Sequence, residues 1–286
     1  MSHSADTNAV FCSDQVRQAD FGRYAASLFV PQYARRSWLA LAAFNAQVAH
    51  VRDHIRQPLA GEIRLQWWRD LLTGGGGQHS EGAAGHPVAA ELLSAIQQHD
   101  LPIELLTRLI DAYGFDVYDD PMPDIAALEA HCRDTAAALY ALQARILGSD
   151  SSDVLRLAEV AGVADGLTNV LASLLKHSAR GQLYIPADLM TLHNLSSGQL
   201  FARERSTALD QAVGQLRAEA VRQLERALEQ LPAIAPDIRP AFLRLALDRQ
   251  MLRRLETSDP FAPPSLSQLQ TLWTLWRAAR SRPFKS

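Results

Sequence analysis

The chain has 286 residues, of which 48% are hydrophobic and 21% charged, a composition typical of globular proteins and not of disordered ones. Its formal net charge of -3 gives no general attraction for nucleic acid, so we expect no nucleic-acid partner. Cys12 and Cys132 are too few for a disulfide framework or a thiolate metal site. The opening residues lack the basic start and apolar stretch of a signal peptide, and no apolar run is long enough to cross a bilayer. These features predict a soluble, cytoplasmic protein.

Apolar residues recur at three- and four-residue steps through most of the chain, which is the period of an α-helix. In the first such segment the pattern runs through Trp38, Leu41, Phe44 and Val48. No pair of alternating runs flanks an Asn-Gly or Asp-Gly turn, so we expect no β-hairpin. The predicted helices are, in chain order, 33–55, 89–98, 104–118, 126–147, 155–177, 209–231, 237–257 and 265–280. The sequence therefore predicts an all-α fold.

Residues 73–86, TGGGGQHSEGAAGH, break the helical pattern. This Gly-rich, polar stretch is typical of a surface loop. A phosphate cradle is the alternative, but neither a Gly-Lys-Ser/Thr sequence nor a preceding strand accompanies it. No internal repeat or composition shift divides the remaining chain. We therefore expect an N-terminal tail over 1–20 and one helical domain over 21–286.

The spacing of polar residues alone indicates few candidate catalytic or metal-binding residues. His50, Asp53 and His54 lie at i, i+3 and i+4 of the first predicted helix, so they share one helical surface. That spacing permits a metal-binding face, although a solvated polar stripe gives the same pattern and is the simpler interpretation. No Gly-x-Ser-x-Gly elbow or cysteine-protease signature is present, so no nucleophile is assigned.

Three longer stretches carry a resemblance to a known family. They are residues 24–53, YAASLFVPQYARRSWLALAAFNAQVAHVRD, residues 115–142, and residues 162–186, GVADGLTNVLASLLKHSARGQLYIP. The most specific landmark is T-N-x-L followed by R-G-x-x-Y-I-P within 168–186. Together these stretches resemble the squalene/phytoene synthase family. The resemblance implies that family's fold, the single-domain all-α isoprenoid (terpenoid) synthase bundle.

Enzymes of this family join two prenyl diphosphates head to head, and the departing diphosphate is met by Mg²⁺ that carboxylates hold. The family supplies the carboxylates from two Asp-x-x-x-Asp motifs on facing helices, where the i, i+4 spacing directs both side chains of a motif the same way. In this chain only one of the four carboxylates survives. The four matching positions are Ala49, Asp53, Ser173 and His177, with His50 where a further Asp is common.

Other family positions are partly kept. The basic residues that often precede the two motifs fall at Ala46 and Ala172, so the expected diphosphate contacts are missing. Asp116 matches an acidic position of the family, and three further residues match its pocket-lining pattern. The resemblance implies a vestigial pocket of Tyr24, Asp53, Asp116, Asn169, Ser173, His177, Arg180 and Tyr184.

One carboxylate should hold Mg²⁺ poorly, and each lost transition-state stabiliser costs about 10²–10³ in rate. We therefore expect no squalene- or phytoene-like product. The family also includes members with decayed motifs, the mitochondrial assembly factors of respiratory complex I, and residues 61–70, GEIRLQWWRD, are similar to that branch. We predict a non-catalytic binding or assembly-factor protein with a protein partner and no cofactor. The alternatives are a head-to-head prenyltransferase with a rearranged site, which would need Mg²⁺, and a carrier of a prenyl or lipid-like ligand.

The family's helix pairing also implies that Asp53 and His177 face each other, with His50 or His54 at the edge of the cavity. A carboxylate with imidazoles suits Zn²⁺ or Fe²⁺ better than Mg²⁺. The simpler alternative is a hydrogen-bonded Asp–His pair that replaces the charge lost from the cavity.

The last predicted helix combines apolar and basic residues. It suits a segment that lies on an anionic membrane surface, and the chain would then be peripheral on the inner face of a membrane. The alternative is a final bundle helix whose Leu/Trp stripe packs into the core. The stripe is formed by Leu266, Leu269, Trp273 and Trp276, and the basic residues are Arg277, Arg280, Arg282 and Lys285.

Overall fold

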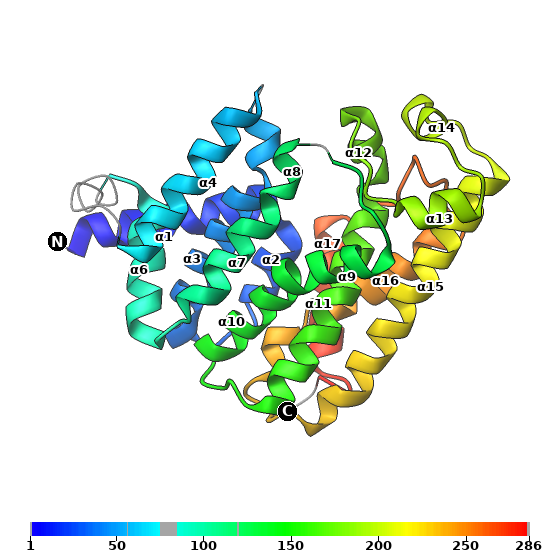
Figure 1. Cartoon of the computed structure of the whole chain (residues 1–286). Coiled ribbons are helices and arrows are strands. Elements are labelled where there is room, and N and C mark those ends of the chain that lie inside the picture. The colour runs from blue at the N-terminus through cyan, green and yellow to red at the C-terminus, as the bar shows by residue number, and fades with distance from the viewer. Residues whose placement is uncertain (1, 56, 75–84, 119, 285–286) are drawn as a thin grey trace.

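The computed structural model describes every residue except 1, 56, 75–84, 119 and 285–286, and it leaves the side chains of 1–5 and 54 undescribed. All regular structure in this described part is helical (Figure 1), so the all-α prediction is confirmed. Most of the Gly-rich stretch predicted as a loop lies outside the described residues. The α-helices are α1 (Ser2–Ala19), α2 (Phe21–Ser27), α3 (Gln32–Ala49), α4 (Pro58–Thr73), α6 (Pro87–His99), α7 (Ile103–Tyr113), α8 (Phe115–Tyr118), α9 (Ile125–Cys132), α10 (Ala138–Ile146), α11 (Ser152–Ala172), α12 (Leu174–Arg180), α13 (Ala187–Leu192), α14 (Ser197–Ala202), α15 (Thr207–Gln230), α16 (Leu245–Leu255) and α17 (Gln268–Ala279). The short helical turns are η1 (Val51–His54), η2 (Arg133–Ala137, π-helical), η3 (Leu231–Ala233) and η4 (Arg239–Phe242).

Two of the predicted long helices are interrupted between the paired positions of the decayed motifs. The helix predicted over 33–55 ends at Ala49, and Asp53 lies on the separate 3₁₀ turn η1. The helix predicted over 155–177 divides at Ser173, where α12 bends away from α11 by 62°. The continuous helices assumed for the motif spacing are therefore wrong, and Asp53 and His177 each lie beyond a break.

The N-terminal segment differs from the tail expected over 1–20. Residues Ser2–Ala19 form α1, which packs against α3 and α6. Cys12 and Val16 of this helix are buried. Two buried positions in a largely polar helix give little apolar periodicity, which is why the pattern along the sequence did not indicate it.

Helix α11 is the packing centre of the molecule. It contacts α9, α10, η2, α15 and α16, and two glycines allow a close approach on one side. A Cβ atom on Gly162 would lie 2.2 Å from Cα of Ala137, and one on Gly166 would lie 2.4 Å from Sγ of Cys132. These contacts fix α11 against α9 and η2, the elements that wall the cavity described below.

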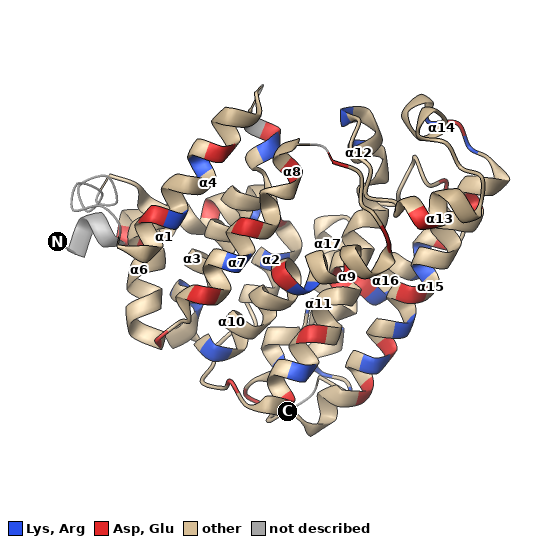
Figure 2. Ribbon diagram, viewed as in Figure 1, with Lys and Arg blue, Asp and Glu red and all other residues tan. Residues whose placement is uncertain are grey.

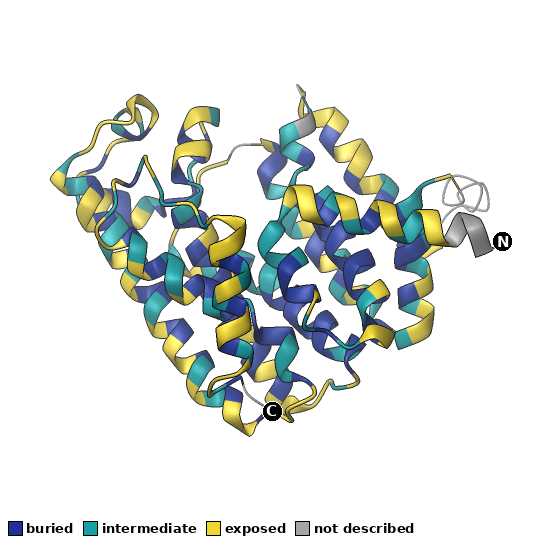
Figure 3. Ribbon diagram, turned by 180° about the vertical axis from the view of Figure 1, so that it is seen from behind, coloured by how far each residue is buried: buried dark blue, intermediate teal, exposed yellow. Residues whose placement is uncertain are grey.

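Buried residues lie on the sides of the helices that face the interior of the bundle, and exposed residues lie on the outward sides (Figure 3). Residues of both charge signs alternate along the outer helix α15 (Figure 2). Within the described residues, no one helix has both the length and the apolar character needed to span a bilayer; α11 and α12 meet those criteria only as a bent pair.

Candidate functional site

A polar cavity of about 450 Å³ lies between α2, α3, α7, α8, α9, η2, α11 and α12. Its walls contain most of the predicted pocket. The predicted residues that line it are His50, Asp116, Asn169, Ser173, His177, Arg180 and Tyr184. Tyr24 and Asp53 are not among the lining residues, and Asp53 lines an adjacent pocket instead. The ring of Tyr24 lies beside Phe21, with centroids 6.0 Å apart, and the guanidinium of Arg17 lies 5.9 Å from the Tyr24 ring. The prediction for Tyr24 is therefore wrong, although its neighbour Arg23 lines the cavity.

Asp53, the surviving motif carboxylate, is held by two cations from α12. Lys176 Nζ donates to Asp53 Oδ2 at 2.8 Å, and Arg180 forms a second ion pair with the same carboxylate. Burial disfavours the charged carboxylate, but the hydrogen bond and charge of Lys176 and the charge of Arg180 outweigh it and hold the pKa of Asp53 below its usual value. Asp53 is therefore an ionised group that side-chain cations neutralise.

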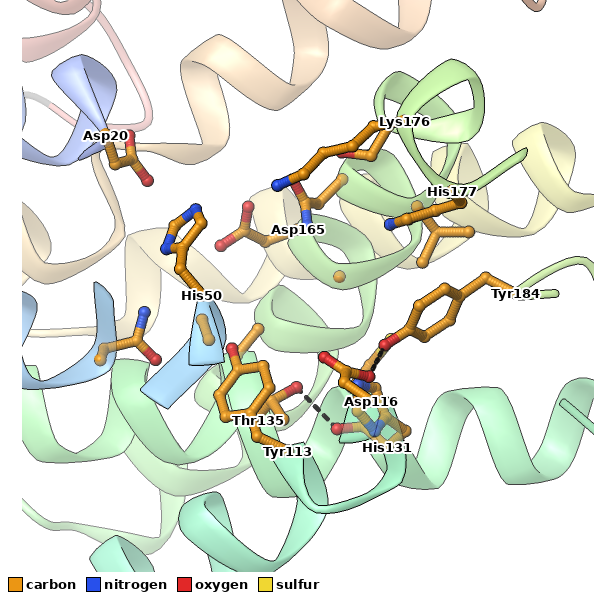
Figure 4. Close-up of a pocket in the computed structure, with 18 of the residues that line it drawn as sticks. Asp20, His50, Tyr113, Asp116, His131, Thr135, Asp165, Lys176, His177 and Tyr184 are labelled. Carbon is orange, nitrogen blue, oxygen red and sulfur yellow. Dashed lines mark hydrogen bonds between the residues drawn. The ribbon is translucent and has the colours of Figure 1, made fainter. Parts of the chain in front are cut away.

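His177 lies beside this cluster without joining it. The side chain is buried, its Nδ1 finds no hydrogen-bond partner among the described residues, and its ring centroid is 4.6 Å from that of Tyr184 (Figure 4). Burial, together with the charges of Lys176 and Arg180, lowers the pKa of His177 to about 3. The imidazole is thus neutral near pH 7. The expected Asp–His pair is not formed, because Asp53 takes its partners from Lys176 and Arg180 instead.

These residues do not fit a catalytic metal. Mg²⁺ requires several oxygen ligands, whereas the one motif carboxylate is engaged by two cations. His50 Nδ1 lies 2.8 Å from the carbonyl oxygen of Ala46, and the side chain of His54 lies outside the description. Across the described ranges, no three His, Cys, Asp or Glu side chains are grouped to hold a metal. The donor set thus suits neither Mg²⁺ nor the Zn²⁺ or Fe²⁺ considered for Asp53, His50 and His177.

The deep wall of the cavity is an ionic network of four residues. Asp165 accepts from Arg23 at 3.0 Å and from Arg244 at 2.9 Å, and both arginines also pair with Asp20 at 3.1 Å. Burial disfavours the Asp20 carboxylate, but Arg244 and Arg23 more than compensate and lower its pKa. Sequence reasoning missed this network. The available signal was Asp165 itself, a single charge inside the apolar run of α11, which must find a partner when buried.

Asp116 and Tyr184 form a second polar contact within the cavity (Figure 4). The Tyr184 hydroxyl donates to Asp116 Oδ1, and burial together with the Asp116 charge raises the pKa of Tyr184. The ring of His131, also drawn there, lies tilted against the rings of Phe115 and Tyr184, and burial lowers the pKa of His131 to about 4. A neutral hydroxyl thus donates to the Asp116 carboxylate, and neutral rings line this end of the cavity.

Comparison with proteins of known sequence identifies relatives of this chain. The squalene/phytoene synthase family model matches residues 16–277. The complex I assembly factor 6 of Rattus norvegicus, an NADH dehydrogenase (ubiquinone) assembly factor, is 28% identical over 267 residues, covering 93% of this chain and 79% of the relative. The presqualene diphosphate synthase of Rhodopseudomonas palustris is 29% identical over 211 residues, covering 73% of this chain and 71% of the relative.

Solved structures show the same fold. The squalene synthase HpnC of Alicyclobacillus acidocaldarius superposes with a TM-score of 0.77 at 19% identity, covering 91% of this chain and 97% of that one. A dehydrosqualene synthase superposes with a TM-score of 0.79 at 18% identity, covering 96% of both chains. Because the family model matches residues 16–277 and the helical architecture agrees with it, the chain belongs to the squalene/phytoene synthase family.

Proposed function

We propose that this chain is a non-catalytic member of its family that binds protein subunits and assists the assembly of a respiratory complex I. The similarity to the assembly factor of Rattus norvegicus, which extends over 93% of this chain, supports the kind of partner. The chemistry of the cavity supports the absence of catalysis.

The observation that carries the proposal is the ion-pair cluster of Asp53, Lys176 and Arg180. Head-to-head prenyl transfer requires cations that are free to bind a departing diphosphate. Here the two cations beside the motif positions, Lys176 and Arg180, are protein side chains already paired with the remaining motif carboxylate. Ala49 and Ser173 contribute no carboxylate, and His177 is neutral.

The deep wall of the cavity argues against the prenyl-carrier alternative. An isoprenoid chain inside the cavity would lie against Asp20, Arg23, Asp165 and Arg244. Apolar contact with charged groups displaces their water without replacing it, which is unfavourable. A wall of this kind favours a polar interior that holds the fold together rather than a lipid-binding pocket.

The catalytic question is tested by incubating the purified protein with farnesyl and geranylgeranyl diphosphates and Mg²⁺. We expect no pyrophosphate release above the protein-free rate and no extractable hydrocarbon product. The presqualene diphosphate synthase of Rhodopseudomonas palustris serves as the positive control in the same assay. Turnover on the order of 1 s⁻¹ or faster would show that the chain is an enzyme with a rearranged site.

The assembly role is tested by deleting the gene in its own cells and measuring assembled complex I on native gels. We expect the amount of complex and its NADH oxidation to fall, and the wild-type gene to restore both. Asp53→Asn, confirmed as folded by circular dichroism, should restore them equally, because the proposal assigns Asp53 no catalytic step. Unchanged complex I after deletion would contradict the assembly role, whatever the outcome of the enzyme assay.

A further inference from the structure

The last helix, α17, has apolar residues both on the face that packs against the bundle and on the opposite, outer face. Its inner face buries Thr271, Leu275 and Ala278, and the helix packs against α2 and α16. Its outer face carries Leu269, Trp273 and Trp276, which are 80%, 61% and 40% exposed. The alternative of a final bundle helix holds for α17 itself, and Leu266 of the Leu/Trp stripe packs half-buried against the core. It is wrong for the rest of the stripe, because Leu269, Trp273 and Trp276 are exposed and residues outside the stripe anchor the helix.

The two exposed tryptophans are held in a defined arrangement. Trp273 and Trp276 stack with centroids 5.0 Å apart and planes 18° apart. The guanidinium carbon of Arg280 lies 4.1 Å from the centroid of Trp276, a cation–π contact. Leu269, Trp273, Trp276 and Arg280 follow one another at steps of four, three and four residues, so they occupy one face of the helix.

The surroundings of this face are basic. Arg277, Arg280 and Arg282 are exposed, and no acidic residue follows Asp259 in the sequence. A soluble surface rarely presents large apolar side chains together unless they contact something. Tryptophan prefers the headgroup level of a bilayer, and arginine keeps its charge among anionic headgroups while its stem covers apolar surface.

We propose that the outer face of α17 is a docking surface for an anionic lipid bilayer, on which the helix lies parallel to the membrane plane. The charge complementarity between three arginines and anionic headgroups selects a membrane as the occupant over an apolar protein groove. The proposal does not depend on the cavity, because no residue of α17 lines it. If the membrane proposal fails, the proposed assembly role is still decided by the deletion experiment described above.

Flotation of the full chain with vesicles tests the proposal. With vesicles of phosphatidylglycerol and phosphatidylcholine we expect binding that decreases at high salt, and with phosphatidylcholine alone we expect little. Arg277→Gln with Arg280→Gln should weaken binding by about fivefold for each arginine. Trp273→Gln with Trp276→Gln should weaken it at least about tenfold, because apolar burial is lost.

Matched controls lie on other surfaces. Leu192 is 63% exposed on α13, and the side chain of Arg156 is 67% exposed on α11, so Leu192→Gln and Arg156→Gln should leave binding unchanged. All these positions are exposed, so an unchanged Tm is expected in each variant. Deleting α17 is a poorer test, because it would uncover the core beneath Leu275. The proposal is overturned if neither pair of variants lowers vesicle binding, if binding ignores lipid charge, or if the wild-type chain does not float with the anionic vesicles.

Discussion

Lys176 places its ammonium 2.8 Å from the carboxylate of Asp53, joining α12 to the turn η1 across the position where the two family motifs would meet. Relatives that ionise a diphosphate need carboxylates to hold a metal ion between two helices. In this chain a side-chain cation makes the connection instead. Ion pairs between protein side chains thus join the two segments.

The first prediction concerns the strength of that connection. In a double-mutant cycle of Asp53→Asn and Lys176→Met, we expect a coupling of about 0.5–1 kcal/mol, because the Lys176 side chain is 45% exposed and water screens the pair. Carboxyl-directed NMR titration of Lys176→Met should also show a higher pKa for Asp53. The exposed pair Asp153–Arg156 is the control, and its coupling should be smaller. Equal coupling energies in the two cycles would mean that the Asp53–Lys176 pair is no stronger than an ordinary surface ion pair.

The second prediction concerns the buried ionic network. Asp165→Asn removes one of the two carboxylates that Arg23 and Arg244 share and leaves only Asp20; the side chains of the two arginines are 11% and 18% exposed. Removing one partner of a buried ion pair typically costs about 3–5 kcal/mol of unfolding free energy. Urea unfolding measures this loss, and Asp153→Asn on the surface should cost less than about 0.5 kcal/mol. A loss below about 1 kcal/mol for Asp165→Asn would show that the two arginines find other partners.

The third prediction is a loss of stability in mild acid. His131 and His177 have pKa values of about 4 and about 3 in the fold, against 6.5 for a free histidine. Below pH 6.5 the unfolded chain therefore binds protons that the folded chain does not, and unfolding becomes more favourable as the pH falls toward 4. Denaturant titrations at several pH values should show this decline, and His131→Gln should make it shallower. A free energy of unfolding that stays constant between pH 7 and pH 5 would contradict these buried neutral histidines.

The fourth prediction compares two helical glycines. Gly162→Ala places a methyl group 2.2 Å from Cα of Ala137, and overpacking against backbone typically costs about 1–3 kcal/mol or more. In the described part of the chain, no atom lies within 4 Å of a Cβ added to Gly214 of α15, so Gly214→Ala should gain about 0.5–1 kcal/mol. Thermal unfolding of both variants measures the difference. Opposite signs are expected, and a neutral Gly162→Ala would show that α11 and η2 can separate without loss.

The sequence by itself determined the fold class and a part of the cavity wall. Apolar periodicity marks the core helices, because a buried helical face repeats every three to four residues, and the landmark over 168–186 identifies the family. The same alignment located Asn169, Ser173 and Tyr184, which line the cavity. It also identified Asp53 as the one carboxylate that remains of the two motifs.

Tertiary structure alone decided what those residues contact. Asp20, Arg23, Asp165 and Arg244 come from three separate regions of the chain, and ion pairs between distant segments leave no periodic pattern in a single sequence. The break at Ser173 redirects α12, so Lys176 rather than His177 reaches Asp53. The exposed face of α17 was likewise undetermined, because an apolar stripe packs equally well against a core or a membrane. Only the placement of Leu275 in the core shows that Trp273 and Trp276 face outward.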